Sequence, residues 1–152
     1  MQKPVLVIKL GSAIISNNNG SVNKKVIQKI ADEIASLTAK WRVVLVSSGA
    51  VGSGKSSIKN YKGSLTERKA AAAVGNPILI QLYHKYFSSH KIAVAQALCE
   101  RHQFSNRSQF WQLKETFTMF WNNNILPVVK ENYLVSNVEL NFSDNDELAA
   151  LI

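Results

Sequence analysis

Four short apolar runs, rich in β-branched residues, constrain the fold of this 152-residue chain more than any other feature. They lie at residues 5–8, 43–46, 92–98 and 125–129. Continuous apolar runs of this length are typical of strands that are buried on both faces of a parallel sheet. The sequence therefore predicts a mainly parallel sheet at the centre of the molecule.

The segments between these runs show helical periodicity instead. Two apolar faces stand out, formed by Ile27, Ile30, Ile34 and Leu37, and by Phe110, Leu113, Phe117 and Phe120. The aromatic stretch at 110–121 could serve as a ligand platform, but its helical spacing favours a core or subunit interface. Strand and helix alternate along the chain, so we predict the α/β class, as a three-layer αβα sandwich.

Length and composition predict a single unit, or part of one. The chain has 46% hydrophobic residues, and neither its start nor any later segment is apolar for long enough to be a signal peptide or membrane span. We therefore expect a cytoplasmic protein. Cys99 is the only cysteine, which excludes an internal disulfide, and we expect it to be buried at the end of the third strand.

The formal net charge of +8 raises the question of a polyanionic partner. Five basic residues lie close together in the sequence: Lys55, Lys59, Lys62, Arg68 and Lys69. The remaining basic residues are spread along the chain, without a nucleic-acid-binding motif. A solvated basic surface is favoured over nucleic-acid binding. The three histidines show no metal-ligand spacing, and no protein-bound metal site is predicted.

Two glycine-containing segments follow predicted strands and are candidates for anion binding. Lys9 ends the first strand before Gly11 and Ser12, where backbone N–H groups and a lysine charge can meet an anion. Residues 49–56, after the second strand, match the G-x-x-x-x-G-K-S phosphate loop of nucleotide hydrolases. That loop needs a helix starting at its Lys-Ser pair, whereas residues 57–64 lack helical periodicity. The phosphate loop is therefore the less favoured interpretation.

A third candidate is the polar segment at 143–147, which precedes an apolar helical pattern that continues to Ile152. In a purely structural interpretation, Ser143 caps this helix and the carboxylates complement its dipole. The three consecutive side chains Asp144, Asn145 and Asp146 can instead orient a lysine, a metal or a substrate amine. Before this segment, residues 133–135 and 138–142 allow a short hairpin.

In this order and spacing, the segments resemble the amino-acid kinase family, and within it the glutamate 5-kinases. The matching segments are 7–12, 46–54, a turn expected at 72–76 with the stretch 79–83 after it, 123–129 and 144–148. Sister families typically place a double glycine after the first lysine, whereas this chain has only Gly11. The resemblance implies the carbamate kinase-like version of the αβα fold. It also assigns the 46–54 loop to an amino-acid substrate, in place of a nucleotide phosphate.

The resemblance implies transfer of the ATP γ-phosphoryl group, with Mg²⁺, to the side-chain carboxylate of glutamate, a step of proline biosynthesis. Lys9 would stabilise the transferred group, helped by the N–H groups of Gly11 and Ser12. Asp146 would hold the catalytic-lysine network of the family. The residues that would bind or support the substrate are Ser48, Gly49, Ala50, Asn145 and Asp144.

The chain departs from the family pattern after the fourth apolar run. There the family usually reads Asn-Glu-Asn-Asp, and its first and last residues contact glutamate; this chain has Lys130 and Tyr133 at those two places. Tyr133 removes an acceptor for the substrate ammonium group, and Lys130 adds a positive charge nearby.

The resemblance covers essentially residues 1–152 as the amino-acid-binding, N-terminal part of a kinase domain, and we expect its nucleotide-binding half to be absent. Two alternatives to an active glutamate 5-kinase remain open. The chain can be an inactive remnant that acts as a binding or oligomerising module, or a basic nucleic-acid-binding domain. Relatives commonly pair subunits through helices beside the sheet, so a homo-oligomer is expected, using the helix at 110–121 or the one around 78–87.

Overall fold

The computed structural model describes residues 3–132, 134 and 145–152. The predicted hairpin, Tyr133 and Asp144 lie outside these residues. The strands are β1 (Val5–Leu10), β2 (Arg42–Ser47), β3 (Ala93–Cys99) and β4 (Ile125–Glu131). The helices are α1 (Ser12–Ile15), α2 (Lys24–Leu37), α3 (Ala50–Gly54), the 3₁₀ turn Lys55–Ser57, α4 (Leu65–Ser88), α5 (Arg101–Ser105), α6 (Arg107–Asn122) and α8 (Asp146–Leu151).

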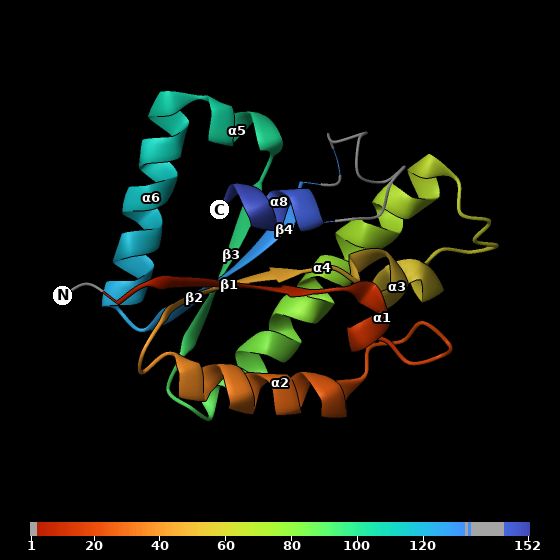
Figure 1. Cartoon of the computed structure of the whole chain (residues 1–152). Helices are drawn as coiled ribbons and strands as arrows, with labels where there is room; N and C mark the ends of the chain where they lie inside the picture. The colour runs from red at the N-terminus through yellow and green to blue at the C-terminus, as the bar shows by residue number, and fades with distance from the viewer. Residues whose placement is uncertain (1–2, 133, 135–144) are drawn as a thin grey trace.

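The four strands form one parallel sheet in the order β1-β2-β4-β3 (Figure 1). Each strand coincides with a predicted apolar run to within a few residues, and Cys99 is buried at the end of β3. Lys9 pairs with Val46, and Leu98 pairs with Lys130, so the carboxyl ends of the strands lie at one edge of the sheet. The predicted α/β class and parallel sheet are confirmed.

Two apolar clusters cover the two faces of the sheet, because successive side chains of each strand point to opposite faces. On one face, Val43 and Leu45 of β2 pack with buried residues of α2 and α4. On the other, Val44 and Val46 pack with Phe117 of α6 and with Leu148 of α8. Helices therefore lie on both sides of the sheet, as the sequence predicts (Figure 1). Phe110 of α6 is exposed, so the aromatic face of this helix is only partly core.

The turn expected at 72–76 is wrong, because these residues lie inside α4, one continuous helix of 24 residues. The helix also includes the segment 78–87, which the sequence suggested as a separate helix. Ser64 and Glu67 form a reciprocal capping box at its start. Gly75 and Pro77 are poor residues for a helix interior. Here the packing of α4 against the sheet and α3 outweighs that local cost.

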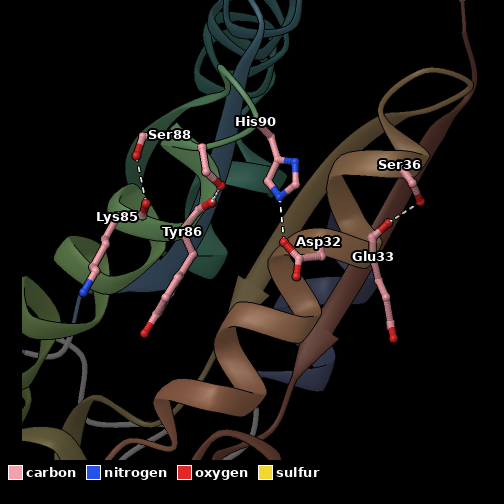
Figure 2. A network of polar contacts seen from close by, with 8 residues as sticks. Asp32, Glu33, Ser36, Lys85, Tyr86, Ser88 and His90 are labelled. Carbon is pink, nitrogen blue, oxygen red and sulfur yellow. Dashed lines mark hydrogen bonds and ion pairs between the residues drawn. The ribbon is translucent and has the colours of Figure 1, made fainter.

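A side-chain contact joins α2 to the residues that follow α4 (Figure 2). The ring of His90, just after α4, lies with Nε2 2.7 Å from Oδ1 of Asp32 on α2. Ser88 closes the last turn of α4 by donating to the carbonyl of Lys85 at 2.8 Å. The His90–Asp32 contact adds a polar link between α2 and the end of α4, which pack in the same apolar cluster under one face of the sheet, away from the edge where the candidate site lies.

Candidate functional site

The candidate site lies at the carboxyl ends of β1 and β2, beside the start of α8. In open parallel sheets, ligands bind at this edge of the strands. Ser48 follows β2 directly, and its backbone N–H donates to the carbonyl of Leu10 in β1 at 2.9 Å. The loops that leave these two strands are therefore tied together, and both segments predicted to bind anions lie at the same edge.

Lys9 and Asp146 form an ion pair across this edge, with 2.7 Å between Nζ and Oδ1. Asp146 is the first residue of α8, so its carboxylate also complements the dipole of that helix. The side chain of Lys9 is 29% exposed and that of Asp146 is 65% exposed, which leaves both groups accessible from solvent. The structure thus brings together the two residues to which the resemblance gives catalytic roles.

Ser48 and Asn145 form a second, buried contact beside this pair. The Asn145 side-chain amide donates to Ser48 Oγ at 3.1 Å, and the two residues are 2% and 7% exposed, in that order. The carbonyl oxygen of the Asn145 side chain is buried and has no hydrogen-bond partner among the residues that the structure describes. Because the Ser48 backbone N–H already bonds to Leu10, Ser48 can offer a ligand only its hydroxyl group.

Glycine is required at position 49 by the backbone of the loop. Gly49 has φ +91°, and a Cβ there would lie 2.6 Å from Cδ1 of Ile15. The next residue, Ala50, starts α3, where the first N–H groups have no partner within the helix. Gly11, in contrast, has an ordinary φ of −70°, and Nζ of Lys9 lies 3.7 Å from the position of its missing Cβ. Ser12 follows as the exposed first residue of α1.

A buried polar network supports residues 47–50, which we call the serine loop, from the α4 side. Lys130 of β4 is fully buried, and its Nζ donates to the carbonyl of Ser47 at 3.0 Å. The Ser47 hydroxyl donates to the Ser48 carbonyl at 3.1 Å, so the Tyr83 hydroxyl, 2.7 Å from Ser47 Oγ, is the donor of that third bond. Desolvation lowers the pKa of Lys130 to about 7 and raises the pKa of Tyr83 to about 12.

Sequence reasoning pointed to Lys130 through its charge but missed Ser47 and Tyr83. Tyr83 lies in the helix expected around 78–87, where a tyrosine is compatible with an ordinary core position, and only the fold brings its hydroxyl to Ser47 of β2. The expected helix start at Ser143 lies outside the described residues, and α8 begins later, at Asp146 with Asn145 as its N-cap. Of the predicted site residues, Lys9, Ser48, Asn145 and Asp146 make the contacts given above, and Asp144 lies outside the described part of the chain.

The described residues show no group of three or more His, Cys, Asp or Glu side chains able to hold a metal ion. None of the described helices has the length and hydropathy needed to cross a membrane. A hollow of about 340 Å³ lies at the opposite, amino-terminal edge of the strands, where the guanidinium of Arg42 stacks over the Trp121 ring. It shares none of the site residues described above.

Comparison with known proteins gives a consistent result. The model of the amino acid kinase family matches residues 4–152. Proteins named glutamate 5-kinase from Teredinibacter turnerae, Caldanaerobacter subterraneus and Bacteroides thetaiotaomicron are 37%, 34% and 37% identical to this chain. The alignments cover 96% to 97% of this chain and 40% to 42% of those relatives, so the chain spans less than half of their length. This chain belongs to the amino acid kinase family.

Proposed function

We propose that the chain provides the carboxylate-binding part of an ATP-dependent kinase that phosphorylates the side-chain carboxylate of glutamate. The single observation that carries this proposal is the placement of Lys9–Asp146 beside Ser48–Asn145 at one edge of the sheet. The names of the relatives identify glutamate as the first substrate to test. An oxygen of the glutamate side-chain carboxylate would form the new bond to the γ-phosphorus of ATP, ADP would leave with the bridging oxygen, and the product would be an acyl phosphate.

The Ser48–Asn145 contact suits one carboxylate of such a substrate, and the Lys9–Asp146 pair suits the carboxylate that receives the phosphoryl group. The Ser48 hydroxyl and the N–H groups of Gly49 and Ala50 can donate to a carboxylate, which is an acceptor-only group when ionised. Lys9 is a compact positive charge on an exposed part of the same edge. Its ammonium group would neutralise the negative charge shared between the attacking carboxylate and the phosphoryl group, where like charges otherwise repel.

Asp146 has a positioning role in this proposal. Its carboxylate holds the Lys9 ammonium group at 2.7 Å and prevents that long side chain from sampling other rotamers. ATP with Mg²⁺ would supply the phosphoryl group and part of the charge neutralisation. The protein's contribution is then to orient two anions, which is the main demand of phosphoryl transfer.

Titration of the chain with glutamate tests the binding part of the proposal. We expect saturable binding by calorimetry or by NMR shifts, with Ser48→Ala weakening it about fivefold because one donor to the carboxylate is lost. Ser53→Ala is the matched control, because among the described residues the Ser53 hydroxyl donates to the Gly49 carbonyl at the start of α3 and is not one of the proposed donors to the carboxylate. Unchanged affinity in Ser48→Ala, or no binding at all, would contradict the proposed site.

Trapping of the acyl phosphate tests the chemical part. With ATP, Mg²⁺, glutamate and hydroxylamine, and with this chain joined to the remaining part of a glutamate 5-kinase relative, we expect hydroxamate to form at least tenfold faster than with Lys9→Met in the same fusion, because that variant lacks the cation at the phosphoryl group. Lys3→Met is the control, since it removes a lysine that bonds to Thr38 at the other end of the sheet. Glutamate binding without hydroxamate would favour the alternative of a binding or oligomerising module.

A further inference from the structure

Two buried groups beside the serine loop favour different properties in a ligand: Lys130 disfavours a positive charge, and Asn145 favours a hydrogen-bond donor. Lys130 places a cation under Ser47, and Asn145 places an unsatisfied acceptor beside Ser48. We propose that the site selects a dicarboxylate with an uncharged hydrogen-bond donor, such as a hydroxyl group, at the place where glutamate carries its ammonium group. This inference rests on the proposed function and narrows its substrate class.

The Lys130 ammonium group lies where its charge affects the binding of a ligand. Lys130 is fully buried, and its ammonium group bonds to the carbonyl of the residue before Ser48, so a ligand held by the Ser48 hydroxyl lies close to it. At an effective dielectric constant near 20, the interaction of two unit charges within about 10 Å of each other changes a binding constant by about tenfold or more. An ammonium group on the ligand is therefore disfavoured, whereas carboxylates are attracted.

The unpaired side-chain oxygen of Asn145 favours ligands that carry a hydrogen-bond donor. The buried side-chain oxygen of Asn145 lacks a partner among the described residues, and an unmade hydrogen bond of this kind is costly. A ligand hydroxyl group can donate to this oxygen without bringing a positive charge near Lys130. A ligand with neither group, such as glutarate, leaves the oxygen unpaired. Together the two residues favour a hydroxyl group over both an ammonium group and a hydrogen atom.

Other charged groups at this edge do not remove the effect of Lys130. Glu131 follows it on β4, where successive side chains point to opposite faces of the sheet. Lys9 and Asp146 carry opposite charges 2.7 Å apart, so their fields largely cancel at a distance. Tyr83, on α4, remains protonated and neutral at ordinary pH because burial raises its pKa to about 12.

Three ligands and two variants test the inference by calorimetry at pH 6, where Lys130 is charged. The ligands are glutamate, 2-hydroxyglutarate and glutarate, which share one carbon skeleton. For the unmodified chain we expect 2-hydroxyglutarate to bind about tenfold more tightly than glutamate and about threefold more tightly than glutarate. In Lys130→Met, the preference for 2-hydroxyglutarate over glutamate should fall to about twofold or less. Lys85→Met, an exposed lysine-to-methionine change elsewhere in the fold, should retain the full preference.

The ratio of the affinities separates a charge effect from a structural one. If Lys130 only supported the loop, Lys130→Met would weaken all three ligands alike and leave the ratio near ten. That result, or equal affinity of the unmodified chain for glutamate and 2-hydroxyglutarate, would overturn the inference and leave the proposed function standing. If none of the three ligands binds, the proposed function fails as well.

Discussion

Lys130→Met is expected to raise the free energy of unfolding by about 2–4 kcal/mol at pH 6, although it removes a hydrogen bond. Burial lowers the pKa of this lysine from 10.5 to about 7, and each pKa unit is about 1.4 kcal/mol of cost to the charged form. Methionine has a similar shape and no charge to desolvate. The donor lost to the Ser47 carbonyl offsets about 1 kcal/mol of the gain.

The buried Lys130 makes the folded chain more stable as the pH rises above 7. Between pH 7 and 10.5 the unfolded chain keeps the proton of Lys130 and the folded chain has lost it, so the free energy of unfolding rises with pH. From pH 7 to 9 the rise is about 2 kcal/mol. Above pH 9 the trend is opposed by Cys99 and Tyr83, because burial raises their pKa values to about 11 and about 12 and the unfolded chain deprotonates first.

Urea denaturation at pH 6, 7, 8 and 9 measures both effects. The unmodified chain should gain stability over this range, and Lys130→Met should be nearly flat. In a chain of this length a gain of 1 kcal/mol corresponds to about 2–4 °C in Tm. Lys85→Met is the control for loss of one positive charge, and we expect a change within about 0.5 kcal/mol. A Lys130→Met protein that unfolds more easily at pH 6 would show that the buried ammonium group stabilises the fold.

Gly75→Ala is expected to lower the free energy of unfolding by about 3 kcal/mol or more, with a large loss of affinity for the site's ligand. Gly75 lies inside α4, where α3 crosses it. A Cβ at Gly75 would overlap the carbonyl oxygen of Ala50 and lie 2.8 Å from the backbone nitrogen of Gly54. Both obstacles are backbone atoms, so a rotamer change cannot relieve the overlap. The two helices must separate, and Ala50 moves the serine loop with it.

The control for Gly75→Ala adds the same methyl group where there is space. At Gly11 the nearest atom to an added Cβ, among the residues that the structure describes, is Nζ of Lys9 at 3.7 Å, an ordinary contact, and the backbone has a φ that alanine adopts. We expect Gly11→Ala to change stability by about 1 kcal/mol or less. Thermal unfolding by circular dichroism compares the two variants. Equal melting temperatures would mean that α3 and α4 can move apart at little cost.

The strands and the helical faces of α2 and α6 follow from the sequence because their periodicity is set by burial. Helix α4 was not predicted correctly by periodicity. Its middle is a run of alanine, glycine and proline without helical periodicity, and local preference suggested a turn. The helix persists because Gly75 permits a contact with α3, a segment about twenty residues earlier. Such a contact between two backbones leaves no apolar pattern in the sequence.

The candidate site was predictable in part. Lys9 and the polar segment with Asp146 stand out because glycine or acidic residues interrupt apolar patterns there, whereas Ser48 was assigned only through the family resemblance, and the structure places all three at one edge. The hydrogen bonds of Ser47 to Tyr83 and Lys130 were not predictable, because serine and tyrosine in these positions are compatible with an ordinary core. Only the order of the strands, with β4 between β2 and β3, brings the Lys130 ammonium group under the serine loop.

The contacts of the site have a consequence for how the protein is made. Lys9 meets Asp146, and Ser48 meets Asn145, 97 positions later in the chain. Contacts so far apart in sequence form late, because a long loop must close first. A ribosome has released the strand with Lys9 long before it adds Asn145 and Asp146. A nascent chain therefore cannot hold the ligand through both contacts, and the site becomes complete only after the residues of α8 have been synthesised and have docked.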